Sequence, residues 1–456
     1  MAHSTKLVRR GLAAVLMLHG CISVGLAADA PNATDSWPQF RGPGARGVSD
    51  SATIPERWTA TENVLWKSDV PGRGWSSPVV RAGRVFLTTV INREASEMPL
   101  KGLYLGGNRP KAPTSVHEWW VYCLDLNTGK ELWKEKVHEG PPPGAKHLKN
   151  SFASETPVVD DERVYCLFGN LGLYVFDLNG KRLWTKTIEA HAMQDGWGTA
   201  ASPTLDGDRL YVINDNDEQS YLLSLDVRTG NEVWRVARDE KSNWSTPFVW
   251  HNSQRTEIIT PGTGRVRSYS IDGKELWSLK GMSSITIATP FAEGDLLFVT
   301  SGFIMSRKRP IYAIRPGASG DISLADDQTS SQFVTWCNWR AAPYNPSTLL
   351  YRGILYVLLD RGILSAFDAG TGKKFFENER IADGGAFTAS PWACNGKVFC
   401  INEDGTTFVF KAGEKYELLH SNKLADDDMT LATPAIVGDK LLIRTANRLY
   451  CISQGK

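Results

Sequence analysis

Short apolar runs, each about the length of one β-strand, recur along the chain and are separated by turns rich in Gly, Asn and Asp. Residues 156–188 show the pattern, with TPVVD, ERVYCLFG, GLYVFDL and KRLWTKTI in succession. Their positions are alternating or wholly apolar, which predicts strands, and no long helical period interrupts them. Four such runs joined by short turns predict a small antiparallel sheet.

This four-strand unit is repeated eight times. The phrases DLNTGKELW, DLNGKRLW, DVRTGNEVW and IDGKELW close four units at Trp133, Trp184, Trp234 and Trp277, and a weaker copy ends at Phe376. A second marker is a Pro eight residues before an aromatic residue or Leu, found at Pro78, Pro157, Pro203, Pro290, Pro391 and Pro434. Both markers recur about every 45 residues, the spacing of propeller blades. Stacking such sheets around a ring buries both faces of each. The sequence therefore predicts an all-β fold, an eight-bladed β-propeller of four-stranded antiparallel blades.

The last unit, ATPAIVGDKLLIRTANRLYCIS, contains three strands. Residues 63–70, NVLWKSDV, precede the first unit and carry the Leu-Trp signature of a closing strand. We expect this N-terminal strand to complete the last blade, so that the ring closes without a covalent bond.

The chain divides into three parts. Residues 1–27 place Lys6, Arg9 and Arg10 before an apolar stretch and small residues, the pattern of a signal peptide. Residues 28–62 form a lead segment, and residues 63–456 form the propeller, with an insertion at 90–118 in the first blade. We expect an exported protein, periplasmic or at the cell surface, with no transmembrane span in the mature chain. The run LHGC ending at Cys21 matches a lipoprotein cleavage site only in part, so we expect no lipid anchor.

Composition excludes some partners. The net charge of +1 provides no field that would favour nucleic acid, so we expect no nucleic-acid partner. Four cysteines, Cys123, Cys166, Cys400 and Cys451, stand beside aromatic residues in equivalent runs, which predicts buried core residues rather than disulfides. Cys394 and Cys400 flank an Asn-Gly turn in a register that does not pair them. The His and Cys residues show no ligand spacing, so we expect no metal site.

The connections indicate which face of the ring carries function. We letter the strands of each blade A to D. The A–B and C–D turns are short, for example RAGR and NTGK, whereas the long connections belong to the B–C and D–A sets. Function carried by loops on a rigid scaffold is therefore expected on the B–C and D–A face.

Comparing the units identifies residues that the repeat itself does not require. At the D–A connections these are Trp75, Lys149, Asn150, Trp197, Asn243, Trp244, Arg340 and Phe387. At the B–C connections they are Asp215, Asp217, Glu218, Asp360, Arg361, Glu403, Asp404 and Arg444. Together they predict a channel mouth with aromatic walls and mixed charge. The aromatic residues fit either inter-blade packing or a stacking platform for a flat ring or a sugar, and the acidic residues fit either solvated turns or a calcium site.

The phrases SETPVVDDERVYCLFG and FDLNGKRLW resemble the repeat of the pyrroloquinoline quinone (PQQ)-like propeller superfamily, which includes quinoprotein alcohol dehydrogenases and the assembly lipoprotein BamB. The opening WPQFRGPGARGVS resembles a secreted bacterial group within it. The resemblance implies that a Gly and a Trp in each repeat dock neighbouring blades, here Gly129 with Trp133, Gly180 with Trp184, Gly230 with Trp234 and Gly273 with Trp277. It also implies a quinone site built with a Trp, two adjacent cysteines, and calcium bound by Glu, Asn and Asp. This chain has no adjacent cysteine pair.

Three functions follow as hypotheses. The first is a non-catalytic scaffold, without cofactor, that binds protein partners through its loop face. The second is a PQQ- and calcium-dependent dehydrogenase of alcohols or sugars. The third is a carbohydrate-binding or carbohydrate-active propeller, which predicts exposed, parallel ring faces at the mouth where the scaffold hypothesis predicts buried ones. No nucleophile or nucleotide-binding motif is present in the sequence.

Overall fold

The computed structural model describes residues 1–3, 36–94, 99–104 and 111–454. They form an all-β structure with only two short 3₁₀ turns, η2 (Pro43–Ala45) and η3 (Gln194–Gly196). Most of the predicted signal peptide, including Cys21, lies outside the described residues. The described part contains no helix long and apolar enough to cross a membrane.

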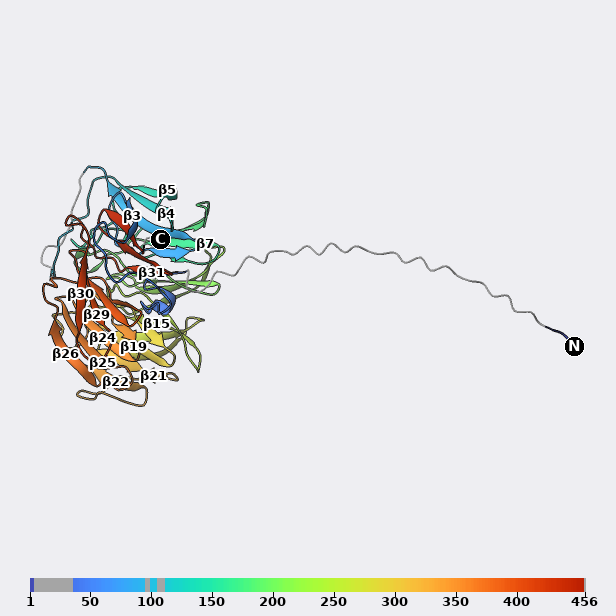
Figure 1. Ribbon diagram of the computed structural model, residues 1–456. Coiled ribbons are helices and arrows are strands. Elements are labelled where there is room, and N and C mark those ends of the chain that lie inside the picture. Colours follow the sequence, from blue (N-terminus) through green and yellow to red (C-terminus); the bar gives the residue numbers. More distant parts are fainter. Residues whose placement is uncertain (4–35, 95–98, 105–110, 455–456) are drawn as a thin grey trace.

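Eight antiparallel sheets are arranged as the blades of a propeller, which confirms the predicted fold (Figure 1). The first four blades are β2–β5 (Val79–Arg81, Arg84–Asn92, His117–Asp125, Glu131–Gly140), β6–β9 (Val158–Val159, Arg163–Phe168, Gly172–Asp177, Arg182–Thr187), β10–β13 (Thr204–Asp206, Arg209–Asn214, Tyr221–Asp226, Glu232–Ala237) and β14–β17 (Phe248–His251, Thr256–Pro261, Arg265–Ser270, Glu275–Lys280). The next three are β18, β19, β20 and β22 (Phe291–Glu293, Leu296–Thr300, Ile311–Ile314, Val334–Asn338), β23–β26 (Leu349–Tyr351, Ile354–Leu359, Ile363–Asp368, Lys374–Arg380) and β27–β30 (Trp392–Cys394, Lys397–Ile401, Thr406–Lys411, Leu418–Lys423).

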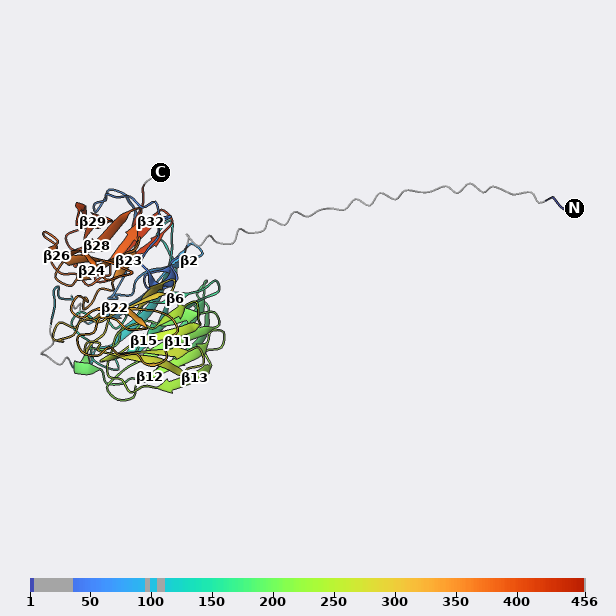
Figure 2. The same cartoon turned by 90° about the horizontal axis from the view of Figure 1, so that it is seen from below.

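The eighth blade joins the first strand of the propeller to its last three strands. It contains β31 (Ala435–Val437), β32 (Lys440–Arg444), β33 (Arg448–Ile452) and, as its outer strand, β1 (Val64–Asp69). Strand β1 pairs antiparallel with β33, with Trp66 opposite Cys451. In Figure 2 the blue β2 of the first blade lies between β32 and β6, so the first blade follows the last one around the ring. The predicted closure by residues 63–70 is confirmed.

Burial within each blade follows strand position. In the second blade, β7 and β8 are almost wholly buried, whereas the outer strand β9 alternates between exposed and half-buried residues. The inner strands are buried on both faces by the adjacent blades, which explains their continuous apolar runs. Only the outer strand keeps polar positions towards solvent.

The closing Trp of one blade packs on the turn Gly of the next, so each docking pair spans two blades. Trp133 lies against Gly180, where a Cβ would stand 2.8 Å from its ring, and its indole N–H donates to Leu178 O at 3.0 Å. Trp184 lies in the same way against Gly230 and donates to Val227 O. The remaining pairs of this kind are Trp66 with Gly129, Trp234 with Gly273 and Trp336 with Gly372. Each of these Trp residues thus contacts the Gly of the following repeat, so Gly180 lies against Trp133 and not against Trp184.

Trp277 departs from this arrangement. Its indole N–H donates to the buried Glu257 carboxylate at 2.6 Å, and an additional strand, β21 (Gly320–Asp321), pairs parallel to β17 beside it. Strand β21 comes from the connection between β20 and β22, at 315–333. The prediction that all C–D connections are short is wrong at this blade, because its extra residues cover the outer edge of the preceding blade.

The lead segment crosses the A–B side of the ring. Trp37 bridges Val80 in the first blade, and Val48 bridges Ala393 in the seventh. Between them the buried Arg41 donates to Thr348 O in the sixth blade at 2.7 Å, and its guanidinium lies 5.1 Å from the Phe291 ring centroid. The segment therefore ties blades on opposite sides of the ring and lies across the channel at this end.

The insertion in the first blade is shorter than expected. The ladder between β3 and β4 continues to the pair Asn92 and His117, so the connection proper runs from 93 to 116 rather than 90 to 118. The six cysteines in the described part are all buried and free, and Cys394 pairs with Lys397 across its turn. These thiols pack the blade cores.

Candidate functional site

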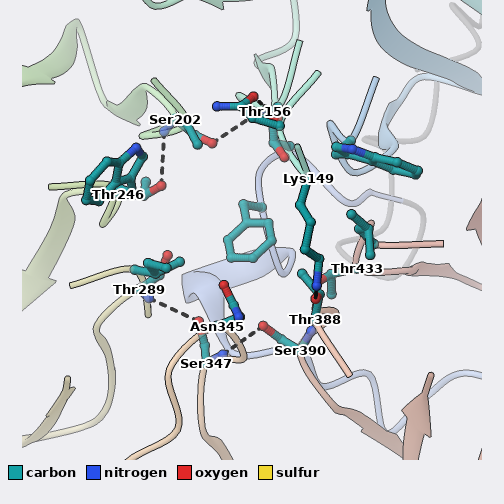
Figure 3. A pocket seen from close by; sticks show the side chains of 18 of the residues that line it. Lys149, Thr156, Ser202, Thr246, Thr289, Asn345, Ser347, Thr388, Ser390 and Thr433 are labelled. Atoms are coloured by element: carbon teal, nitrogen blue, oxygen red, sulfur yellow. Dashed lines mark hydrogen bonds between the residues drawn. The ribbon is translucent and has the colours of Figure 1, made fainter. Parts of the chain in front are cut away.

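A chamber occupies the channel on the B–C and D–A side of the ring (Figure 3). Its volume is about 220 Å³, and residues from all eight blades line it. Phe40, from the lead segment, also lines it, while Leu103 and Tyr104 reach it from the insertion. The chamber lies on the face where the sequence predicted function.

A ring of hydroxyl groups surrounds the chamber, one from each blade. Its members are Ser77, Thr156, Ser202, Thr246, Thr289, Ser347, Ser390 and Thr433. Six of the hydroxyl oxygens accept a backbone N–H from the preceding blade at 2.9–3.0 Å, as Ser202 does from Thr156 and Ser390 does from Ser347. Figure 3 shows them around the cavity with the bonds that link neighbouring blades. The ring thus joins the blades at the axis and also forms the polar part of the wall.

Sequence reasoning missed this ring, although its signal is present. Seven of the eight hydroxyl residues come directly before a Pro, in Ser-Pro or Thr-Pro pairs such as Thr156-Pro157. In the sixth blade the order is reversed, and Ser347 follows Pro346. The recurring Pro indicates the period of the units, and a hydroxyl residue before a Pro is too common in turns to indicate a site by itself.

Three of the four predicted aromatic residues lie in the chamber wall. Trp75, Trp197 and Trp244 line it, together with Tyr344, and each is only 7% exposed. The rings of Trp197 and Trp244 are 5.7 Å apart and tilted by 40°, so they do not form a flat, parallel platform. Phe387 is buried against Phe408 and does not line the chamber.

Lys149 extends across the mouth of the chamber towards the seventh blade (Figure 3). Its ammonium donates to Glu403 at 2.5 Å, Thr388 Oγ1 at 2.8 Å and Gly102 O at 2.9 Å. The Glu403 carboxylate also accepts the Gly102 N–H at 2.7 Å. Both polar groups of the Gly102 backbone are therefore held by one buried ion pair, and this fixes residues 99–104 over the chamber.

The other predicted residues near residues 99–104 have separate roles. Asp404 pairs with the exposed Lys101 of the insertion. Asn150 braces its own loop by donating to Trp197 O and Thr199 O at 3.0 and 2.8 Å. His147 lies against Trp197, and burial, followed by the charges of Lys149 and Lys146, lowers its pKa to about 4. The imidazole beside the chamber is thus neutral at neutral pH.

Asp215 and Asn243 lie together but outside the chamber wall. Arg238, whose side chain is fully buried, makes two bonds to the Asp215 carboxylate at 2.7 and 3.0 Å, and Asn243 donates to the same carboxylate at 2.6 Å. Burial opposes the charge of Arg238, yet the Asp215 carboxylate raises its pKa. This network stabilises the junction of the third and fourth blades. The interpretation of Asp215 as part of a solvated turn is therefore wrong. Asp217 accepts from Ser242, and Glu218 from His191.

Asp360 caps a loop rather than facing the chamber. Its carboxylate accepts the backbone N–H groups of Tyr344 and Asn345, each at 3.0 Å, and burial raises its pKa. Arg340 and Arg361 are exposed, and they lie in D–A and B–C connections respectively. Arg444 is buried and donates to Ser76 O and Thr88 O at 2.9 and 2.7 Å, and burial lowers the pKa of its guanidinium to about 9.

The residues of the chamber do not fit a PQQ–calcium pair. None of the described lining residues is Asp or Glu, so the wall offers no carboxylate to calcium. Lys149, the one Lys or Arg in the described wall, is already paired with Glu403. Within the described ranges no group of three or more His, Cys, Asp and Glu is placed to hold a metal. The described wall offers hydroxyl groups and apolar rings to a ligand, and it contains no pair of carboxyl groups for acid–base chemistry.

The fold is an eight-bladed propeller with a cavity at one end of its channel. A family model described as outer membrane protein assembly factor BamB (PQQ_2) matches residues 117–259. The BamB of Burkholderia pseudomallei (strain K96243) is 24% identical over 276 residues, covering 55% of this chain and 66% of that relative, just under two thirds of its length. Over this part of its length the chain is similar to the PQQ-like β-propeller family.

Solved structures agree on the fold. BamB from Moraxella catarrhalis gives a TM-score of 0.56 at 12% identity, over 85% of this chain and 98% of that chain. A europium-containing methanol dehydrogenase gives 0.58 at 10% identity, over 92% of this chain and 98% of that chain. An assembly factor and an enzyme are thus matched equally well, so these similarities establish the fold and leave activity to the site.

Proposed function

We propose that this protein is an exported, non-catalytic scaffold that binds protein partners through the B–C and D–A face of its propeller. The observation that carries the proposal is the construction of the two faces. The A–B side is crossed by the lead segment, whereas the other side holds the insertion, the chamber mouth and the exposed Arg340 and Arg361. A surface of varied loops on a rigid ring is suited to recognition.

The chemistry of the mouth supports binding over catalysis. Three of the predicted carboxylates make structural contacts. Glu403 pairs with Lys149, Asp215 pairs with Arg238, and Asp360 accepts backbone N–H groups. The similarity to an outer membrane assembly factor supports a partner-binding role, and the signal-peptide pattern of residues 1–27 supports export. The proposal includes the absence of a quinone cofactor.

Site-specific photo-crosslinking in the native host tests the face. A photoreactive residue is placed at Arg340 or Arg361 and, as the matched control, at Asp208, an exposed residue in the A–B turn of the third blade. We expect discrete protein adducts from the mouth positions and none from Asp208. Adducts from Asp208 alone, or an intact signal peptide on the cytoplasmic protein, would overturn the proposal.

A titration with PQQ and calcium tests the absence of the cofactor. We expect no saturable quenching of tryptophan fluorescence and no rise in melting temperature. Quenching that is lost in Trp197→Ala would instead make the dehydrogenase hypothesis the better one.

A further inference from the structure

The hydroxyl ring has donor capacity that the fold does not use. A hydroxyl group has one proton to donate and two lone pairs. In six blades the oxygen accepts a neighbouring N–H, yet no acceptor for the hydroxyl proton lies within reach among the described residues, as at Ser202 and Ser390. Ser77 Oγ is buried and has no partner in the described part of the chain. Hydroxyl protons without an acceptor favour a ligand whose oxygen atoms can accept hydrogen bonds.

Among the described lining residues, no charged group is available to pair with an ionic ligand. Lys149 is the one Lys or Arg among the described lining residues, and three acceptors already surround its ammonium group. The described lining contains no carboxylate. An ionic guest would lose its hydration without gaining a counter-charge, which is costly in an enclosed site. The electrostatics therefore favour an uncharged ligand.

The rest of the wall is apolar and curved. Trp197, Trp244 and Tyr344 form one side, and Leu103 and Leu431 contribute aliphatic surface. The tilt of 40° between the two indoles suits a non-planar ring of C–H groups better than a flat aromatic system. A guest with an apolar C–H surface and many oxygen atoms around its edge matches both parts of the wall.

We infer that the chamber binds one residue of an uncharged sugar, with its oxygens on the hydroxyl ring of Figure 3 and its C–H surface against Trp197, Trp244 and Tyr344. The sugar is either free or the end of a glycan. The inference is independent of the scaffold proposal, because it concerns the chamber wall and not the exposed mouth. It also does not depend on an exposed stacking platform, since the hydroxyl groups carry the recognition.

The probes are neutral hexoses and N-acetylhexosamines, each tested together with a short oligomer of the same sugar, at up to about 50 mM. Glucuronic acid and glucosamine serve as charged analogues. Binding is followed by tryptophan fluorescence and by titration calorimetry on the full mature protein. We expect at least one neutral sugar to bind, and its charged analogues to bind about tenfold more weakly or worse. Equal affinity for monomer and oligomer supports a free sugar, and tighter binding of the oligomer supports a glycan end.

Thr289→Val is the informative variant, because Thr289 lines the chamber and its hydroxyl group makes none of the hydrogen bonds that link neighbouring blades in the described chain. We expect it to weaken sugar binding about three- to tenfold, the effect of one neutral hydrogen bond, with little change in melting temperature. Thr407→Val is the matched control, since Thr407 is buried with an unpartnered hydroxyl within the described chain but lies away from the chamber. Ser77→Ala replaces Thr289→Val if that variant does not fold.

Two results would overturn the inference. One is the absence of any response to every sugar in the panel. The other is an equal affinity of the chamber variant and Thr407→Val for the sugar that binds. Crosslinking from Arg340 and Arg361 should be unchanged in Thr289→Val, so failure of the sugar site and failure of the scaffold proposal are distinguishable.

Discussion

The packing of Trp184 on Gly230 permits a direct test of how the blades are held together. Gly230 has φ 72° in the turn between β12 and β13, and a Cβ there would lie 2.5 Å from the nearest Trp184 ring atom. The indole N–H of Trp184 donates to Val227 O in the same turn at 3.1 Å. Gly230→Ala therefore forces either the ring or the turn to move.

Two costs combine in this variant. An alanine in the left-handed region costs about 1–2 kcal/mol, and overpacking a close contact costs about 1–3 kcal/mol more. Gly207→Ala is the matched control, because Gly207 lies in the same blade with φ 55° and nothing stands within 4 Å of its added Cβ. The difference between the two variants, about 1–3 kcal/mol, therefore measures the inter-blade contact.

Thermal unfolding of the two variants measures this difference. In a chain of this length each kcal/mol lowers the melting temperature by about 2 °C or less, so Gly230→Ala should melt a few degrees below Gly207→Ala. Equal melting temperatures would refute the reasoning, since the cost would then lie in the backbone alone and the indole contact would contribute nothing.

Three further outcomes are expected. Lys149→Met leaves the Glu403 carboxylate buried without its cation, so it should lower the free energy of unfolding by about 3–5 kcal/mol and expose Leu103 to chymotrypsin. The control Lys101→Met breaks an exposed ion pair worth at most about 1 kcal/mol. Equal proteolysis of both variants would contradict the role of Lys149 in holding residues 99–104 over the chamber. Burial holds the pKa of His147 at about 4 in the folded protein, below its usual value, so the unfolded chain binds more protons than the folded protein between pH 6.5 and 4. The free energy of unfolding should therefore fall as the pH falls through this window. His147→Gln should flatten the dependence of the melting temperature on pH there. The six buried thiols should react with a thiol reagent only after unfolding, and rapid labelling of the native protein would show that the blade cores open.

The fold could be predicted because its information is local and repeated. Each unit places its apolar runs, turn Gly and closing Trp at the same spacing, so the blade count and the closing role of residues 63–70 follow from comparing units. The partner of each Trp did not follow, because contact of Trp133 with Gly180 rather than with Gly129 depends on how neighbouring blades stack. Spacing along one repeat contains no information about that choice.

The site was predicted in location more than in composition. The correct face and five wall residues could be found from the connections: Trp75, Lys149, Asn150, Trp197 and Trp244. Asp215 looked like a loop carboxylate because its partner Arg238 lies 23 residues away and only tertiary packing buries the two together. The path of the lead segment could not be predicted either, since its contacts, such as Arg41 with Thr348, belong to no repeat.

The pairing of β1 with β33 has a consequence for how the protein folds. Trp66 and Cys451 are roughly 385 residues apart, and joining such distant points in an unfolded chain costs about 5 kcal/mol of entropy. Once seven blades have formed in order, the two strands are neighbours and almost none of that cost remains. Ring closure should therefore come last, after the whole chain has been delivered, and a β1 strand waiting without its partner would be the segment most accessible to chaperones and proteases.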